Sequence, residues 1–217
     1  MTENALAPKQ QRSRETLSRL LLATVEVLDA EGLSGATVPR IAQAAGVAPA
    51  SIYRRFKDRD ALLRAAFVHV LEQSERSTRS VLRIETFRDK TLEGVMRALV
   101  GGTIQQYVRY PKLMRAFFRF TENDTDQAFR KRALELVSSN LTAGVDLLLK
   151  HFRSEIKHSN PKRALTFALL SVGAVIEERA MAEVSLWHTT LPVSNTQLQH
   201  DLTRMVLAYL RYGPKVI

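Results

Sequence analysis

The stretch GVAPASIYRRFKDRDALL, residues 46–63, decides the fold of this 217-residue chain. Ile52 and Phe56 are four positions apart, so a helix over residues 49–56 places both on one inward face. The outward faces and the following turn carry four basic residues, which are Arg54, Arg55, Lys57 and Arg59. A basic run of this kind is by itself most often a solvated helix face. Its neighbours therefore decide whether it has a further role.

A second short helix is predicted directly before this one, over TVPRIAQAAGV, residues 37–47. Thr37 is a typical N-cap, and Pro39 fits the first helical turn, where a missing N–H costs little. Gly46 suits a left-handed helix end. Two short helices joined by a tight turn that contains glycine form a helix-turn-helix, whose second helix enters the major groove of DNA.

Longer helices are predicted on both sides of this pair. Residues 13–30 carry an apolar stripe at helical spacing, with Ser13 as the expected N-cap and Glu31-Gly32 as the expected end. Asp58 is the expected N-cap of the helix that follows. The sequence thus predicts a helix-turn-helix DNA-binding domain over residues 13–74, preceded by a flexible polar tail over residues 1–12.

In order and spacing these residues resemble the N-terminal domain of the tetracycline-repressor (TetR) family over about residues 14–67. The matching positions include Leu28, Gly32-Leu33, Thr37, Ile41-Ala42, Ala45-Gly46-Val47, Ile52-Tyr53, Phe56, Arg59 and Leu62. Two positions depart from the family pattern. The family usually has lysine at the position of Arg59, and often Ser or Thr at that of Ala48. The recognition helix therefore lacks its usual side-chain cap, for which Pro49 at the first helical position partly compensates.

The resemblance implies that a set of residues lies at a DNA surface, namely Thr37, Pro49, Ala50, Ser51, Tyr53, Arg55 and Arg59. Spacing and charge add Arg54 and Lys57 to that set. Small residues at the start of the recognition helix let it approach the groove floor, where base edges differ. The tyrosine hydroxyl and the cationic groups suit backbone phosphates, and Arg55 also suits a guanine edge.

Beyond residue 80 the sequence reads as helical throughout, which predicts an all-α protein. The expected helices cover residues 91–110 and 111–120, a span from Asp124 or Thr125 to about 151, then 162–186 and 195–213. The resemblance implies that residues 75–217 form a larger helical domain for effector binding and dimerisation.

In the family the middle helices hold a small-molecule pocket, and candidate lining residues here are Tyr107, Arg109, Phe117, Phe118 and Trp187. Most of the aromatic residues equally fit a plain core. Arg109, Lys112, Arg115 and Arg119 form one basic face, which suits either an anionic effector or a solvated surface. The last two long helices are expected to pair with a second copy of the chain. The candidate interface residues are Val172, Ile176, Leu202, Met205, Val206 and Tyr209. Completion of a monomer core is the alternative for them.

Composition limits the other function classes. The net charge is +10, but residues 1–80 hold 12 Lys and Arg against 9 Asp and Glu, so global basicity points only weakly to nucleic acid. Cysteine is absent, which excludes disulfides and thiolate sites and suits a cytoplasmic protein. The five histidines show no metal-ligand spacing, and no catalytic or phosphate-loop motif is present, so neither an enzyme nor a cofactor or metal is expected. The apolar runs are too short for a membrane span.

The sequence therefore predicts a transcriptional repressor that binds a palindromic operator in double-stranded DNA as a homodimer. An unknown small-molecule effector is expected to release it. Two alternatives stay open at this point. One is a DNA-binding regulator without an effector, controlled by occupancy or by a protein partner. The other is a purely structural helical adaptor.

Overall fold

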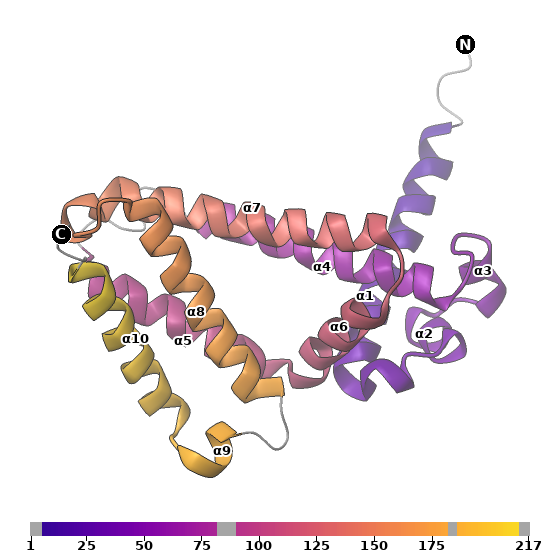
Figure 1. The fold of residues 1–217 in the computed structure, drawn as a ribbon. Helices are drawn as coiled ribbons and strands as arrows, with labels where there is room; N and C mark the ends of the chain where they lie inside the picture. Colours follow the sequence, from indigo (N-terminus) through magenta and orange to yellow (C-terminus); the bar gives the residue numbers. More distant parts are fainter. Residues whose placement is uncertain (1–5, 82–89, 182–185, 213–217) are drawn as a thin grey trace. The chain divides into compact units, whose positions relative to one another are not determined.

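The computed structural model describes residues 6–81, 90–181 and 186–212, and every regular element in these ranges is helical. This confirms the predicted all-α class. Figure 1 shows the helices in chain order. Their bounds are α1 Leu6–Gly35, α2 Val38–Ala45, α3 Pro49–Tyr53, α4 Arg59–Val81, α5 Leu92–Arg109, α6 Pro111–Asn123, α7 Gln127–Phe152, α8 Pro161–Met181, α9 Leu186–Thr190 and α10 Asn195–Arg211, with a short 3-10 turn at Arg153–Glu155. None of the described helices is both long and apolar enough to cross a membrane.

The chain divides into two compact units. The first combines residues 1–73 with residues 112–134, and the second combines residues 74–111 with residues 135–217. The domain limits expected from the sequence, 13–74 and 75–217, stay predictions. The structure adds that α6 and the first turns of α7 pack with the helix-turn-helix rather than with the second unit.

Helix α1 begins at Leu6, seven residues before the N-cap expected at Ser13. That expectation was wrong, and residues 6–12 of the predicted tail are helical, since Gln10, Gln11 and Arg12 favour a helix. The expected end near Gly32 is confirmed in position, because Gly32 adopts φ 72° and ψ −171° and interrupts the helix. A further short helical stretch runs on to Gly35.

The helix-turn-helix forms as its sequence predicts. The Thr37 hydroxyl accepts a hydrogen bond from the Arg40 amide, and Pro39 lies in the first turn of α2. Gly46 takes the left-handed conformation, φ 64°, in which its amide bonds to carbonyls at the end of α2. Helix α3 has Pro49 at its first position and no side-chain cap at Ala48. It ends at Tyr53 rather than near Phe56, whose ring is only half-buried.

The first unit is organised around inward residues of α1, α2, α3 and α4. Those with almost no exposed surface include Leu20, Leu28, Ile41, Ile52, Leu62, Leu63 and Phe67. The ring of Phe67 on α4 packs edge-on against Phe117 and tilted against Phe120, with centroids 5.3 and 5.4 Å away. These contacts attach α6 to the core of the helix-turn-helix.

The turn between α6 and α7 differs from expectation. Asp126, not Asp124 or Thr125, caps α7, because its carboxylate accepts from the Phe129 amide at 3.0 Å. Asp124 is buried and pairs with Arg64 of α4 instead. Burial alone raises the pKa of Asp124, but the hydrogen bonds from Arg64 and from the Asp126 amide outweigh it and hold the pKa below its ordinary value.

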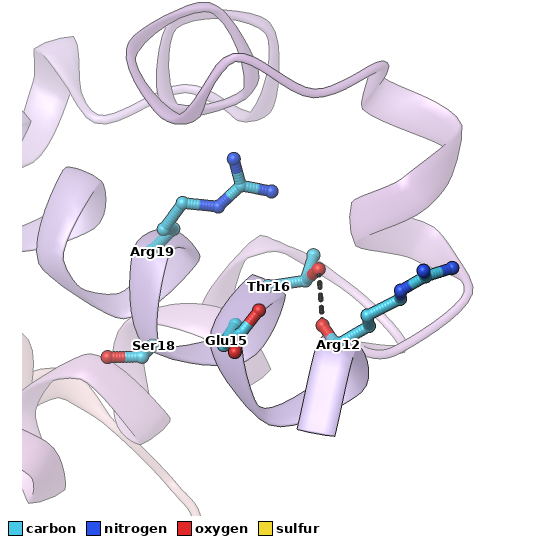
Figure 2. Close-up of a pocket in the computed structure, with 5 residues that line it drawn as sticks. All are labelled: Arg12, Glu15, Thr16, Ser18 and Arg19. Atoms are coloured by element: carbon cyan, nitrogen blue, oxygen red, sulfur yellow. Dashed lines mark hydrogen bonds between the residues drawn. The ribbon is translucent and has the colours of Figure 1, made fainter. Parts of the chain in front are cut away.

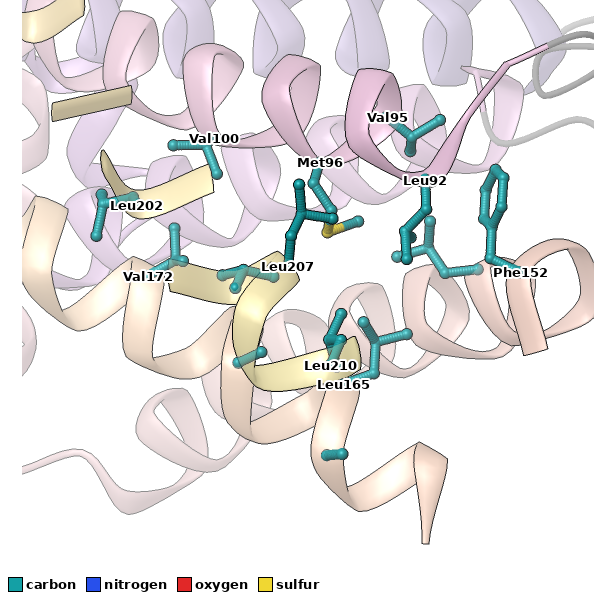
Figure 3. Close-up of a cluster of buried hydrophobic side chains, with 14 of the residues drawn as sticks. Leu92, Val95, Met96, Val100, Phe152, Leu165, Val172, Leu202, Leu207 and Leu210 are labelled. Atoms are coloured by element: carbon teal, nitrogen blue, oxygen red, sulfur yellow. The ribbon is translucent and has the colours of Figure 1, made fainter. Parts of the chain in front are cut away.

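The second unit has its own core, in which α5 packs on α8 and α10, and α7 contributes further apolar side chains. Figure 3 shows Leu92 and Met96 of α5, Leu165 of α8 and Leu210 of α10 among the side chains of this core. The last helix, α10, begins at Asn195 as expected, and the Ser194 hydroxyl caps it by accepting from the Gln197 amide. The helix end expected near Gly213-Pro214 lies outside the described residues, as does the span 182–185 of the helix expected over 162–186.

Candidate nucleic-acid interface

The face of α3 that points away from Ile52 is open to solvent. Pro49 and Ala50 are exposed there and Ser51 is half-buried, and Arg54, Arg55 and Lys57, which follow the helix, are exposed as well. Tyr53 is 58% exposed, although its ring would be more stable in a core. An aromatic ring held in water between basic residues, on the second helix of a helix-turn-helix, is placed to meet a partner. Thr37, at the start of α2, is also exposed.

Two hydrogen bonds order the basic side chains at the end of α3. Arg54 donates from Nη2 to the hydroxyl of Ser51 at 2.8 Å. Arg55 donates from Nη1 to the hydroxyl of Ser13 on α1 at 3.0 Å. Both arginines keep further N–H groups, since a guanidinium has five donors. The second bond also places the N-terminal part of α1 beside the recognition helix.

Arg59 differs from the other predicted DNA contacts, because its side chain points toward the protein backbone. Its side chain is half-buried, and it donates from Nε to the carbonyl of Ala36 at 2.8 Å and from Nη2 to the carbonyl of Leu33. The phosphate contact that the resemblance implies for Arg59 is untested, but the guanidinium is turned toward the protein backbone.

A shallow hollow of about 650 Å³ lies along α1 and is lined by Arg12, Glu15, Thr16, Ser18 and Arg19. Figure 2 shows the side chains of Arg12 and Arg19 extending from the helix with Thr16 between them. The Thr16 hydroxyl donates to the carbonyl of Arg12 at 2.8 Å. Two exposed guanidinium groups at this spacing suit backbone phosphates.

The sequence did not predict this surface on α1, although the basic residues in and near RSRE, residues 12–15, are evident in it. With the helix expected to start at Ser13, Arg12 belonged to a flexible tail and had no fixed position relative to Arg19. The helix that begins at Leu6 gives both residues one face.

The five candidate effector residues are divided between the two units. Phe117 and Phe118 pack edge to face in the first unit, with centroids 5.6 Å apart. The other three belong to the second unit. Burial, and then the charge of Glu177, raise the pKa of Tyr107 there to about 12. Arg109 is exposed and lies 5.3 Å from the centroid of the Tyr110 ring, and Trp187 is half-buried in α9.

One residue of the predicted basic face, Lys112, has a structural role. Lys112 donates to the carbonyl of Ala30 at 2.6 Å, near the point where Gly32 interrupts α1. A cation at that position stabilises the terminal carbonyls of a helix. This explains Lys112 without a ligand.

Burial corrects the set of candidate dimer residues. Val172, Ile176, Leu202 and Val206 are at most 5% exposed and belong to the core of the second unit, so they have no surface to offer a second copy. The sequence could not separate them from outward residues, because α8 is apolar on more than one side and α10 carries apolar residues at both buried and exposed positions. Met205 and Tyr209 are 47% and 37% exposed and keep the role as candidates.

Within the described ranges no group of three or more His, Asp or Glu side chains is arranged to hold a metal ion.

Comparison with known proteins agrees with this geometry. Residues 20–66 match the model of the family described as bacterial regulatory proteins, tetR family. The HTH-type transcriptional regulator BetI of Escherichia coli (strain K12) is 25% identical over 146 residues, which make up 67% of this chain and 72% of BetI. The family match covers α2 and α3 together with parts of α1 and α4.

Solved structures share the architecture over most of the chain. A TetR-family transcriptional regulator from Mesorhizobium loti MAFF303099 has a TM-score of 0.70 at 19% identity, over 92% of this chain and 96% of that one. The regulator FadR from Bacillus subtilis, solved in complex with stearoyl-CoA, has a TM-score of 0.63 at 18% identity, over 88% and 98% of the two chains. At these identities the likeness shows the fold.

Proposed function

The chain belongs to the TetR family of bacterial DNA-binding transcriptional regulators, which are not enzymes, and we propose that this member is a repressor released by a small molecule. It binds a palindromic operator in double-stranded DNA as a homodimer, in the cytoplasm, where bacterial DNA lies. The observation that carries the proposal is the exposed face of α3, with Tyr53 in water among basic residues.

The proposed DNA contacts divide by chemistry. Pro49 and Ala50 leave room for the start of α3 to reach the groove floor, where Ser51 and Arg55 donate to base edges. Tyr53 and Arg54 reach phosphates at the groove wall, as does Lys57. Thr37 presents the N-terminal amides of α2, a helix end that favours an anion.

Dimerisation is supported by apolar side chains that the second unit leaves exposed. Phe167 and Leu170 of α8 are 58% and 57% exposed, in addition to Met205 and Tyr209 of α10. The rings of Phe167 and Tyr209 lie 5.6 Å apart, so exposed apolar side chains of the two helices meet. A surface of this kind marks an interaction site in a soluble protein. Two half-sites on DNA also require a two-fold partner.

An effector is proposed to bind the helical second unit. The FadR structure from Bacillus subtilis holds stearoyl-CoA, which supports the class of function but names no ligand for this chain. In the second unit a cavity of about 260 Å³ is lined by residues of α5 and of the start of α10, among them Gly102, Gln105, Asn195 and Gln199. An effector that prefers a conformation unable to bind DNA releases the operator, and operator DNA then weakens effector binding by the same factor.

DNA selection from a random duplex library tests the proposal. The purified protein is expected to enrich a palindrome, and the Tyr53→Ala, Lys57→Ala double variant is expected to lose that enrichment. Compounds are then screened for release of the enriched operator. If the protein enriches no sequence even after it is stripped of ligands by refolding, the proposed DNA function is wrong. If no compound releases the operator, the result favours a regulator that has no effector.

A further inference from the structure

The side chain of Arg59 joins two corners of the first unit. Arg59 is the first residue of α4, and its guanidinium donates to the carbonyls of Leu33 and Ala36, between the Gly32 break in α1 and the start of α2. The residue before it, Asp58, caps α4 by accepting from the Ala61 amide at 2.7 Å. The corner between α3 and α4 is therefore held to the corner between α1 and α2.

The two carbonyls that receive Arg59 are left open by the backbone around them. In a continuous helix the Thr37 amide would bond to the carbonyl of Leu33, but it bonds to the carbonyl of Gly35 at 2.8 Å. The Arg40 amide would bond to the carbonyl of Ala36, but it bonds to the Thr37 hydroxyl at the cap of α2. Carbonyls at helix ends need other partners, and the cation supplies them.

The geometry of these two hydrogen bonds suits arginine better than lysine. The guanidinium presents its N–H groups in a rigid planar fork, so Nε and Nη2 reach two carbonyls at once in fixed directions. A lysine ammonium carries the same charge on a flexible stem and holds no such fork. The departure from the family pattern, in which lysine is usual at this position, then has a structural reason.

We propose that Arg59 is a positioning residue of this DNA-binding unit, which sets the orientation of α2 and α3 by clamping the carbonyls of Leu33 and Ala36, and that it is not a phosphate contact. The inference rests on the proposed DNA function. It replaces the role that resemblance implied for Arg59 with one that acts through α2, whose N-cap, Thr37, directly follows Ala36.

Salt dependence separates the two roles. Loss of one phosphate contact weakens binding to all sequences alike and lowers the slope of log affinity against log salt by about one unit. Loss of a clamp leaves that slope unchanged, because no counterion is released at Arg59. It weakens the selected operator more than random DNA, since only base contacts require α3 in one orientation.

The experiment compares Arg59→Lys and Arg59→Ala with the native full-length protein on the selected operator and on random duplex DNA, over a series of salt concentrations. Both variants are expected to bind the operator about tenfold more weakly, with random DNA affected less than about twofold and the salt slope unchanged. Hydrogen exchange of the α2 amides, including that of Ile41, is expected to accelerate in both variants without DNA. Arg130→Ala, which removes one exposed charge of the same unit, is the matched control and is expected to match the native protein in every readout.

The proposal is overturned if Arg59→Ala lowers the slope by about one unit while Arg59→Lys behaves as the native protein, because charge alone would then be sufficient. Native affinity and native exchange in both variants also overturn it. If the native protein binds no DNA, the proposed function fails, and amide exchange in the soluble Arg59→Lys variant still decides whether the clamp exists.

Discussion

Arg64 of α4 and Asp124 of the α6–α7 turn form a two-pronged ion pair. Nε of Arg64 lies 2.7 Å from Oδ2 of Asp124, and Nη2 lies 2.9 Å from Oδ1. The Asp124 side chain is 1% exposed and that of Arg64 is 25% exposed, so the pair is largely shielded from water. It is the polar counterpart of the ring contacts that attach α6 to Phe67, and it explains why residues 112–134 fold with the first unit.

Asp124→Asn is expected to lower the free energy of unfolding by about 2 kcal/mol, because it removes the two-pronged charge pair and leaves the guanidinium with the more distant carboxylate of Asp126, 3.7 Å from Nη1. Chemical denaturation measures this difference. The exposed pair of Glu93 and Arg97 is the control, since its side chains are 46% and 57% exposed and Arg97→Ala should cost less than about 0.5 kcal/mol.

The difference in free energy of unfolding between the native protein and Asp124→Asn should depend on pH. Because the folded-state pKa of Asp124 is below its unfolded value, its contribution is present above about pH 4 and is lost as pH falls through the folded-state pKa. The difference in stability between the native protein and Asp124→Asn should therefore become smaller in acid. A gap that is the same at neutral and strongly acidic pH would contradict this account of the pair.

Gly46→Ala is expected to cost about 1 kcal/mol of folding free energy, because alanine is strained at φ 64°. An added Cβ would meet no atom within 4 Å, so the cost is that of the backbone alone. Gly102→Ala in the interior of α5 is the matched control, since it also meets nothing within 4 Å. With no positive φ there, thermal unfolding should show it stabilised by about 0.5 to 1 kcal/mol. Equal effects of the two substitutions would contradict the conformational argument.

Local signals predicted the helix-turn-helix well, because its determinants lie within a few residues of one another. Thr37, Pro39, Gly46 and Pro49 each act on the backbone beside them, and each has its expected position in the structure. Ser13 failed as a cap because residues 9–12 do not stop a helix, and Pro8 is tolerated in the first turn of α1. A good capping residue inside a longer helical segment gives a false start signal.

The remaining differences depend on contacts far apart in the sequence. The sequence offered Asp124 as a cap, but its carboxylate accepts from Arg64, which lies sixty positions away in the sequence. Val172 and Met205 have similar apolar side chains, and only packing decides that the first is buried and the second exposed. Periodicity defines a helix face but does not identify what covers it.

Lys57→Ala is expected to weaken binding to operator and random DNA by the same factor and to lower the salt slope by about one unit. Lys57 is exposed, lies between α3 and α4, and carries a point charge suited to phosphate. Fluorescence titrations at several salt concentrations measure both quantities. A variant that loses operator affinity with an unchanged slope would remove Lys57 from the proposed phosphate contacts.

The native protein should lose stability at alkaline pH because of Tyr107, and Tyr107→Phe should abolish that loss. The folded-state pKa of Tyr107 is raised to about 12 by burial and by the charge of Glu177, above the ordinary value of 10.0. Its stabilising contribution is thus complete below pH 10 and is lost as pH rises toward 12. We expect the native protein to lose roughly 1 kcal/mol more than the variant over that interval, a figure reduced because the ring is partly in water. Denaturation at stepped pH measures it, and identical curves would exclude the shift.

Met205→Glu tests whether the exposed apolar surface of α8 and α10 joins two copies of the chain. Met205 is 47% exposed, so the folded monomer should tolerate glutamate, whereas an interface would bury two like charges near its two-fold axis. Sedimentation is expected to show a native dimer and a variant shifted toward monomer, with operator affinity reduced because the half-sites are no longer joined. Gln106→Glu, an exposed position on α5, is the control and should remain dimeric. A Met205→Glu protein that stays dimeric at low micromolar concentration would place the interface on another surface.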